Sequence, residues 1–134
     1  MATKGAIITD FGSYDKGRSV YIQSDGKIAV IGFTSGATSD DLAIAHYNSN
    51  GSLDTTFGTN GKVVTTAVIG TNAIQPLSND QFLIVGTPFH NIFNFAVARY
   101  NQNGDLDQTF GTNGKVVTDM GTEDVACGVM EQAS

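Results

Sequence analysis

The chain has 134 residues, of which 40% are apolar and 15% are charged, with a formal net charge of −6 at pH 7. These values exclude a disordered chain and a membrane protein, because the apolar residues suffice for a core and no apolar run approaches the roughly 20 residues of a membrane helix. The acidic charge and the seven scattered Lys and Arg residues argue against nucleic acid and anionic membranes as partners, since both require a basic patch.

The N-terminal segment, MATKGAIITDFG, lacks the long apolar stretch and the small-residue cleavage site of a secretory signal peptide. A cytoplasmic protein and part of a longer surface or secreted protein both fit this, and the compartment stays open. Within this segment, Gly5–Asp10 aligns with Gly61–Thr66 and Gly114–Asp119, and the last two share GKVVT. We expect each of the three segments to hold a short strand, here called strand A.

Three further strands, B to D, are expected in each full copy of the repeat. In the second copy the strands A to D are predicted at Lys62–Ala67, Asn72–Leu77, Gln81–Thr87 and Asn94–Tyr100. Strand C is the most apolar, with continuous runs at Ile28–Ile31 and Phe82–Val85. A strand that is apolar on both faces is expected to be buried on both faces, so the small sheets must stack face to face.

Turns rich in Asn, Asp and Gly separate the predicted strands. Asn and Gly both tolerate the positive φ that a type I′ hairpin turn demands. We therefore predict such turns at Asn50-Gly51, Asn60-Gly61, Asn103-Gly104 and Asn113-Gly114. Asp25-Gly26 is expected to make the same kind of turn between strands B and C of the first copy.

The longest internal repeat pairs His46–Thr65 with Arg99–Thr118, which are identical at 16 of 20 positions. The four differences are His46/Arg99, Ser49/Gln102, Ser52/Asp105 and Thr55/Gln108. Repetition at a fixed period, with short buried strands, predicts an all-β fold of β-propeller-type blades, each of four antiparallel strands. A β-sandwich is the alternative, because it explains the density of strands but does not require the repetition.

The whole chain, 1–134, is interpreted as one repeat module. Repeat 1 covers about 5–60, repeat 2 about 61–113, and a partial repeat 3 about 114–134. This gives about two and a half repeats, whereas propellers close with roughly four to eight blades. We therefore expect copies of the chain to complete the ring, as a homodimer or a homotrimer.

Three motifs resemble a known family: D-G-K-I-x-V-x-G, A-x-A-[RH]-Y-N and N-G-x-L-D-x-T-F-G-x-x-G-K-V. Together they are similar to the delta-60 repeat, a bacterial repeat of blades in large, often surface-associated proteins. The resemblance runs from Gly5 to about Gln132 and implies a β-propeller, but no established activity. The chain departs from the pattern at His46, where the repeat usually has Arg, and at 79–81, where Asn-Asp-Gln replaces Asp-Gly-Lys.

Residues shared by both copies are interpreted as parts of the blade. The predicted anchors between blades are Leu53/Leu106 and Phe57/Phe110. Asp54 and Asp107 each precede a Thr by two residues, so they are expected to accept backbone N–H groups in a tight turn. The glycines predicted to bracket the link to the next strand A are Gly58/Gly111 and Gly61/Gly114.

Two loops echo the oxygen-rich pattern of calcium-binding loops. Their oxygen-bearing residues are Asn48, Asn50 and Asp54 in the first copy and Asn101, Asn103 and Asp107 in the second. The side chains are mostly neutral amides and no bidentate Glu follows, so a plain hairpin explains them better. Whether they bind calcium stays open, and no metal, cofactor or catalytic residue is assigned.

The candidate reactive side chains are few. His46 in strand D and His90 in a loop occupy non-equivalent places in their copies, and Cys127, the single cysteine, is interpreted as a small buried hydrophobe. The acidic pairs Asp40-Asp41 and Glu123-Asp124 are expected to be solvated. No nucleophile–base–orienter set is evident in the sequence, which indicates a protein that is not an enzyme.

One loop differs between the copies and is a candidate interface. Thr87–Asn94 carries Phe89, Ile92 and Phe93, whereas its counterpart Thr34–Asp41 is small and polar. An apolar loop marks either a contact surface or packing against a neighbouring blade, and both interpretations are kept.

The sequence thus predicts a non-catalytic repeat module that serves as a binding or scaffold domain, with a protein or carbohydrate as its ligand. One alternative is a propeller enzyme of lactonase or hydrolase type with its site in a central channel. The other is an oligomeric lectin, whose aromatic platforms would have to come from Tyr14, Tyr21, Tyr47 or Tyr100, because tryptophan is absent.

Overall fold

The computed structural model describes residues 2–3, 5–36, 40–65, 69–87, 94–119 and 121. These residues form strands, turns and loops, and no helix occurs among them. In chain order the strands are β1 (Ala2–Thr3), β2 (Ala6–Ile7), β3 (Asp15–Ile22), β4 (Ile28–Ser35), β5 (Asp40–Tyr47), β6 (Lys62–Thr65), β7 (Ile69–Pro76), β8 (Phe82–Thr87), β9 (Phe95–Tyr100) and β10 (Lys115–Thr118). A search of the same residues for a helix suited to crossing a membrane finds none.

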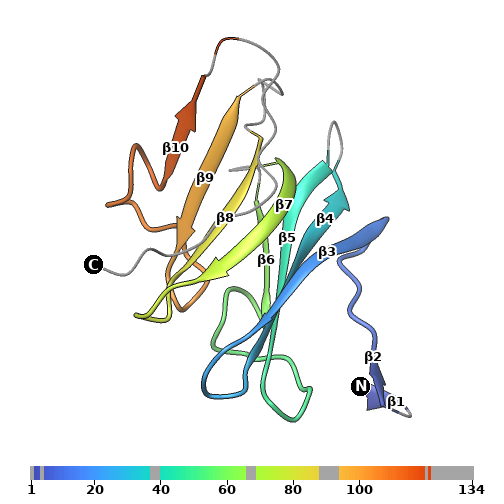
Figure 1. Cartoon of the computed structure of the whole chain (residues 1–134). Helices are drawn as coiled ribbons and strands as arrows, with labels where there is room; N and C mark the ends of the chain where they lie inside the picture. Colours follow the sequence, from blue (N-terminus) through green and yellow to red (C-terminus); the bar gives the residue numbers. More distant parts are fainter. Residues whose placement is uncertain are drawn as a thin grey trace.

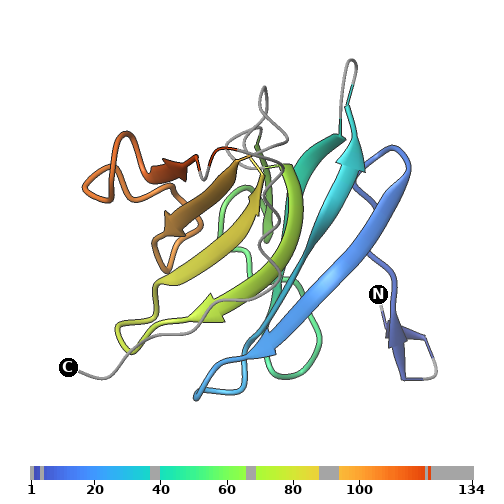
Figure 2. The same cartoon turned by 45° about the horizontal axis from the view of Figure 1, so that its top comes forward.

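Eight of the strands form two four-stranded antiparallel sheets that lie side by side (Figures 1 and 2). The first blade has the order β3-β4-β5-β6 and the second blade has the order β10-β9-β8-β7. In both, each strand pairs with the next one along the chain, as in a propeller blade and unlike the Greek-key connections of a β-sandwich. The prediction of an all-β fold made of four-stranded, propeller-type blades is confirmed.

Each blade combines strands B, C and D of one repeat with strand A of the next. β6 pairs with β5 from Leu42↔Thr65 to Ala45↔Lys62, and β10 pairs with β9 in the equivalent register. The sheet therefore does not group strands A to D of one repeat, as the order along the sequence had suggested. The link after strand D folds back on itself, with His46 N donating to Gly61 O at 2.9 Å, and this places the next strand A beside strand D.

Strand positions agree closely with prediction, but the most buried strand is a different one. Strand C of the first copy, β4, alternates buried and half-buried residues, whereas β5 is buried continuously from Leu42 to His46. The prediction that strand C is buried on both faces is therefore correct only in part. β5 is covered on one face by the second blade and on the other by the N-terminal segment, where Thr9 Oγ1 hydrogen-bonds Tyr47 Oη.

The core lies between the two blades. It consists of residues from both sheets, namely Ile31, Leu42, Ile44, Phe57, Phe82, Ile84, Ala96, Ala98 and Tyr100. Stacked rings run through it, with ring centroids 6.1 Å apart for Phe57 and Phe82 and 5.4 Å apart for Phe82 and Tyr100. The prediction for Phe57 as an anchor between blades is confirmed, and burial of such a ring contributes about 2–3 kcal/mol.

The other predicted anchors are less buried than Phe57. Phe110 is half-buried and lies beneath the Arg99 guanidinium, 4.7 Å from Cζ to the ring centroid, on the face of the second blade that points away from the first. Leu53 and Leu106 are half-buried and pack against Gly61 and Gly114, where an added Cβ would clash with the leucine side chains.

The hairpin turns divide into two kinds. Both residues have positive φ at Asn60-Gly61 (53° and 85°) and at Asn113-Gly114 (54° and 86°), which confirms the predicted type I′ turns. At the other predicted sites only the glycine has positive φ, namely Gly26, Gly51 and Gly104. The type I′ prediction is wrong there, because these are wider loops in which Gly51 N donates to Asn48 O and Asn48 N donates to Ser52 O.

Candidate functional site

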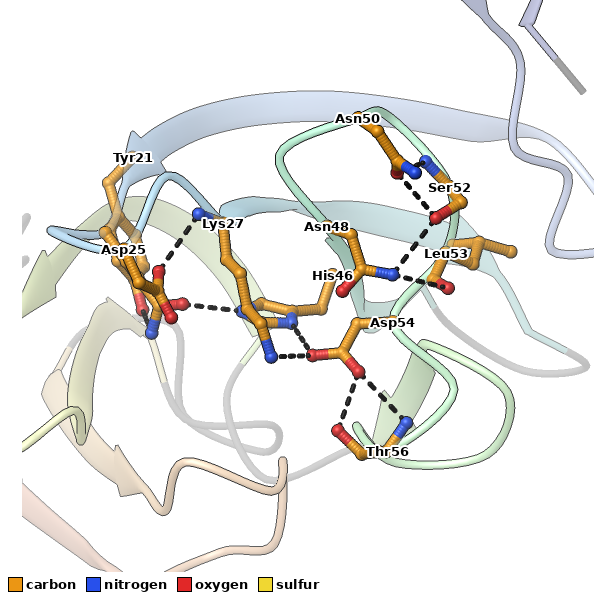
Figure 3. A network of polar contacts seen from close by, with 11 residues as sticks. Tyr21, Asp25, Lys27, His46, Asn48, Asn50, Ser52, Leu53, Asp54 and Thr56 are labelled. Carbon is orange, nitrogen blue, oxygen red and sulfur yellow. Dashed lines mark hydrogen bonds and ion pairs between the residues drawn. The ribbon is translucent and has the colours of Figure 1, made fainter.

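The most connected polar cluster of the first blade surrounds Asp54, which is buried at the end of β5. Its backbone N donates to His46 O at 2.9 Å, so the link after strand D brings this carboxylate beside the strand. Oδ1 accepts from Thr56 N at 3.1 Å and from Thr56 Oγ1 at 2.6 Å. Oδ2 accepts from Lys27 Nζ at 2.9 Å and lies 3.1 Å from His46 Nδ1 (Figure 3). We call Gln23, Lys27, His46, Asp54 and Thr56 the Asp54 network.

The second blade repeats this arrangement around Asp107. Oδ1 accepts from Thr109 N at 3.0 Å and from Thr109 Oγ1 at 2.7 Å. Oδ2 accepts from Gln81 Nε2 and from Arg99 Nε, both at 2.8 Å. The predicted turn role of both aspartates, as acceptors of backbone N–H groups, is confirmed, and each also binds two side chains from neighbouring strands. Gln81, Arg99, Asp107 and Thr109 form the Asp107 network.

The two networks exchange the position of their cation. In the first blade Lys27 stands before strand C and His46 lies in strand D, whereas the second blade has Gln81 and Arg99 at the equivalent places. Each aspartate therefore contacts one permanently charged cation. The two positions at which a copy departs from the repeat pattern share one carboxylate in each blade: Lys27 and His46 contact Asp54, and Gln81 and Arg99 contact Asp107. The sequence analysis did not connect these two positions, although both carry different residues in the two copies.

Hydrogen bonding holds both carboxylates in the charged form. Burial alone would raise the pKa of Asp54, but the bonds from Thr56 and Lys27 outweigh burial and hold the pKa well below its ordinary value. The side-chain and backbone bonds from Thr109, assisted by Gln81 and Arg99, lower the pKa of Asp107 to about 2. Both groups therefore remain anionic at neutral pH.

His46 is buried and fully engaged. Its ring stacks on Phe57 with centroids 4.5 Å apart, and its two nitrogens face Asp54 Oδ2 and the Gln23 side-chain amide, each at 3.1 Å. Burial lowers the pKa of His46 despite the nearby Asp54. A His–Asp pair of this kind orients a base in hydrolases, but here the second nitrogen meets an amide and no nucleophile.

A small cavity of about 290 Å³ opens beside the Asp54 network, at the seam between the blades. It is lined by the network itself and by two residues of the second blade, Gln102 and Asn103. The seam is closed there by a backbone hydrogen bond of 2.7 Å from Gly58 N to Asn103 O. The network therefore braces the strands of one blade at the point where the next blade makes contact.

The two loops with a calcium-like pattern use their polar atoms internally. Asn50 Oδ1 accepts from Ser52 N at 3.0 Å and from Ser52 Oγ at 2.7 Å, and Asn48 Nδ2 donates to Ser52 Oγ at 3.0 Å. Asn103 Oδ1 likewise accepts from Asp105 N at 3.1 Å. Within the described ranges no group of three or more His, Cys, Asp or Glu side chains is placed to hold a metal.

The remaining candidates are scattered, or lie outside the described residues. Those outside are Phe89, His90, Ile92, Phe93, Glu123, Asp124 and Cys127. Asp40 is exposed and accepts from Ser35 Oγ at 3.2 Å, which fits the predicted solvated acid. Of the four tyrosines, Tyr14 is exposed, Tyr21 and Tyr47 are half-buried and Tyr100 is buried, so they do not form a shared platform.

Comparison with known proteins supports the propeller interpretation. A family model described as "Domain of unknown function (DUF5122) beta-propeller" matches residues 23–57 and 83–110. These ranges run from strand C through the Asp54 network in the first blade and from strand C to Phe110 in the second. No curated protein and no solved structure matches the chain. The chain is thus similar to a β-propeller family to which no function is attached.

Proposed function

We propose that the chain is a non-catalytic module of delta-60 repeats that serves as a binding or scaffold domain and assembles with further copies of itself, as a homodimer or homotrimer. The polar networks support a structural role, because the hydrogen bonds of Asp54 and His46 are all made within the first blade. The binding role follows from the open blade faces rather than from a reactive centre.

The observation that carries this proposal is that each blade exposes apolar side chains on its outer face. The first blade exposes Val20 and Ile22 of β3, and the second blade exposes Val116 of β10. Propellers bury such faces by closing a ring of roughly four to eight blades. Two blades in water leave apolar faces that favour association, and symmetry favours a closed assembly.

The first test is the molar mass in solution, by light scattering coupled to size-exclusion chromatography. A discrete dimer or trimer is the expected result, with a mass that is stable on dilution through the micromolar range. A folded monomer of 14.1 kDa at every concentration would overturn self-assembly as part of the function.

The hydrolase alternative has one observation in its favour, the His46–Asp54 pair. It is tested by assaying ester and lactone hydrolysis by the chain and by a His46→Arg variant, which restores the residue found at this place in the second copy. Turnover that disappears in the variant while folding is retained would favour the enzyme. We expect no turnover by either protein, because the second ring nitrogen of His46 faces the Gln23 amide rather than a nucleophile.

A further inference from the structure

The N-terminal segment contacts the first blade in the same way that β6 contacts the second blade. Ile7 Cδ1 lies over Gly51, where an added Cβ would be 2.4 Å away, and Val63 Cγ2 lies over Gly104 at an equivalent 2.9 Å. Thr9 hydrogen-bonds the Tyr47 hydroxyl, and Thr65, the equivalent of Thr9, lines one groove together with Tyr100, the equivalent of Tyr47. Residues 5–10 therefore occupy the place of a strand A that belongs to a further blade.

Beside this segment, the outer face of the first blade has a groove. A cavity of about 190 Å³ is lined by small and branched side chains, among them Val30, Ala43 and Ala45, and by Thr9 and Phe11 of the N-terminal segment. The equivalents of Ala43 and Ala45 are Ala96 and Ala98, which are fully buried in the core against Ile31 and Ile44 of the first blade. The small residues thus form a recess that receives branched side chains from a neighbouring blade.

The complement to this groove is the outer face of the second blade. Val97 is the repeat equivalent of Ile44, and it pairs with Val116 on β10. Because Ala96 and Ala98 point into the core, Val97 and Val116 must point outward. Phe110 lies on the same face, at the place that Phe57 takes in the seam within the chain.

We infer that a second copy of this chain docks its second blade, through Val97 and Val116, into the groove above Ala43 and Ala45, and that residues 5–10 are a cap that this docking displaces. The interface continues the seam inside the chain by the same repeat operation. Displacement is required because β10 of the incoming copy and residues 5–10 compete for one place. This inference rests on the proposed self-assembly and specifies its interface.

The test compares two matched pairs of full-length variants by sedimentation equilibrium. Val116→Glu charges the docking face, and Val117→Glu places the same charge on the next residue of β10, which is similarly exposed (46% against 40%) and points to the opposite face. Val116→Glu is expected to raise the dissociation constant at least about tenfold relative to Val117→Glu, because the interface would bury an unpaired charge.

The second pair tests the cap. Ile7→Asp removes the side chain that contacts Gly51, and Ile8→Asp changes its strongly exposed neighbour. Ile7→Asp is expected to lower the dissociation constant by about five- to tenfold relative to Ile8→Asp, since the cap then competes less well for its place. Weaker assembly of Ile7→Asp would overturn the cap and make the segment part of the interface.

The other outcomes separate the inference from the proposed function. A wild-type oligomer that Val116→Glu and Val117→Glu weaken equally would overturn this interface and leave self-assembly standing. Monomers throughout, Ile7→Asp included, would overturn both. Circular dichroism checks that each variant is folded, and a disulfide between copies gives a second readout. With Cys127 replaced by serine, Ala45→Cys is expected to cross-link to Val97→Cys and not to Val117→Cys when the single-cysteine chains are mixed.

Discussion

At the scale of single residues, the two repeats pair a buried aspartate with a cation from two different positions. A buried aspartate anchors the link after strand D, and an uncompensated buried carboxylate is costly. The first blade supplies the cation from Lys27, ahead of strand C, and the second supplies it from Arg99, within strand D. Burial is the main cause of the lowered pKa of His46, and Lys27 acts in the same direction, so the two positions are energetically coupled.

This coupling predicts the outcome of a residue exchange. Lys27→Gln alone is expected to lower the free energy of unfolding by about 1–2 kcal/mol, a modest cost because the Lys27 side chain is 34% exposed. Adding His46→Arg recreates the set of the second blade and is expected to restore most of the loss. Chemical denaturation of the wild type, both single variants and the double variant forms a double-mutant cycle. Strictly additive effects would show that the positions are independent.

His46 also predicts a pH dependence of stability. Burial lowers its folded pKa below the ordinary 6.5, with Lys27 acting in the same direction and Asp54 opposing. The unfolded chain therefore binds a proton first as the pH falls, and the free energy of unfolding should decrease below about pH 6.5. Thermal unfolding between pH 7.5 and pH 5 measures this, with ~0.5-unit steps. His46→Arg should lack this decrease, and an identical profile in the variant would contradict the assignment.

At the scale of elements, hairpin chemistry accounts for most of the blade. The type I′ turns at Asn60-Gly61 and Asn113-Gly114 join the folded-back link to strand A. The turn between strands B and C has Gly26 with φ 85° in the first copy and Asp80 with φ 64° in the second. A side chain in this left-handed region is strained relative to glycine, so the second blade has the poorer turn.

We therefore predict that Asp80→Gly stabilises the protein. The expected gain in the free energy of unfolding is about 0.5–1 kcal/mol, the relief of backbone strain less the added entropy of the unfolded chain. Urea unfolding measures it. The reciprocal control, Gly26→Asp, should destabilise by more than this gain, because a Cβ there would also lie only 3.2 Å from Ser49 Cβ. A loss of stability in Asp80→Gly would mean that the aspartate side chain contributes more than its backbone costs.

At the scale of the whole molecule, the defining feature is the seam between blades. Phe57 and Val63 of the first blade close on Gly104 of the second, and Gly58 N donates to Asn103 O. The same contact type recurs at Gly51, where the neighbour is only Ile7 of the N-terminal segment. The two glycines share the same backbone conformation, with φ of 91° and 90°, so they differ in what they touch.

Alanine substitutions at Gly104 and Gly51 separate the packing energy of the seam from the cost of backbone strain. Gly104→Ala is expected to destabilise the chain by about 1–3 kcal/mol more than Gly51→Ala, because its Cβ would lie 2.9–3.1 Å from Val63 and Phe57, held in the core. The methyl group at Gly51 meets the end of one flexible side chain, which can move aside. Differential scanning calorimetry of both variants makes the comparison. Equal losses would indicate that backbone strain, rather than packing between blades, dominates at both sites.

Much of the fold follows from the sequence because its signals are local. Turn residues mark the ends of strands, apolar runs mark the strands themselves, and the 16 identities between His46–Thr65 and Arg99–Thr118 show that one unit is repeated. Phe57 as an anchor, and both aspartates as turn acceptors, were likewise predictable, since each depends on residues within a few positions.

The tertiary structure decided what depends on pairing between distant segments. Strand A joins the preceding strand D because the link folds back by hydrogen bonds such as His46 N to Gly61 O, which no periodicity encodes. Lys27 and His46 are 19 positions apart and are coupled only because Asp54 receives both. The equivalence of residues 5–10 and β6 is likewise visible only in the structure, where Ile7 and Val63 contact equivalent glycines of the two blades. A repeat in sequence specifies the unit, but the contact between units depends on the surfaces that the folded sheets present to each other.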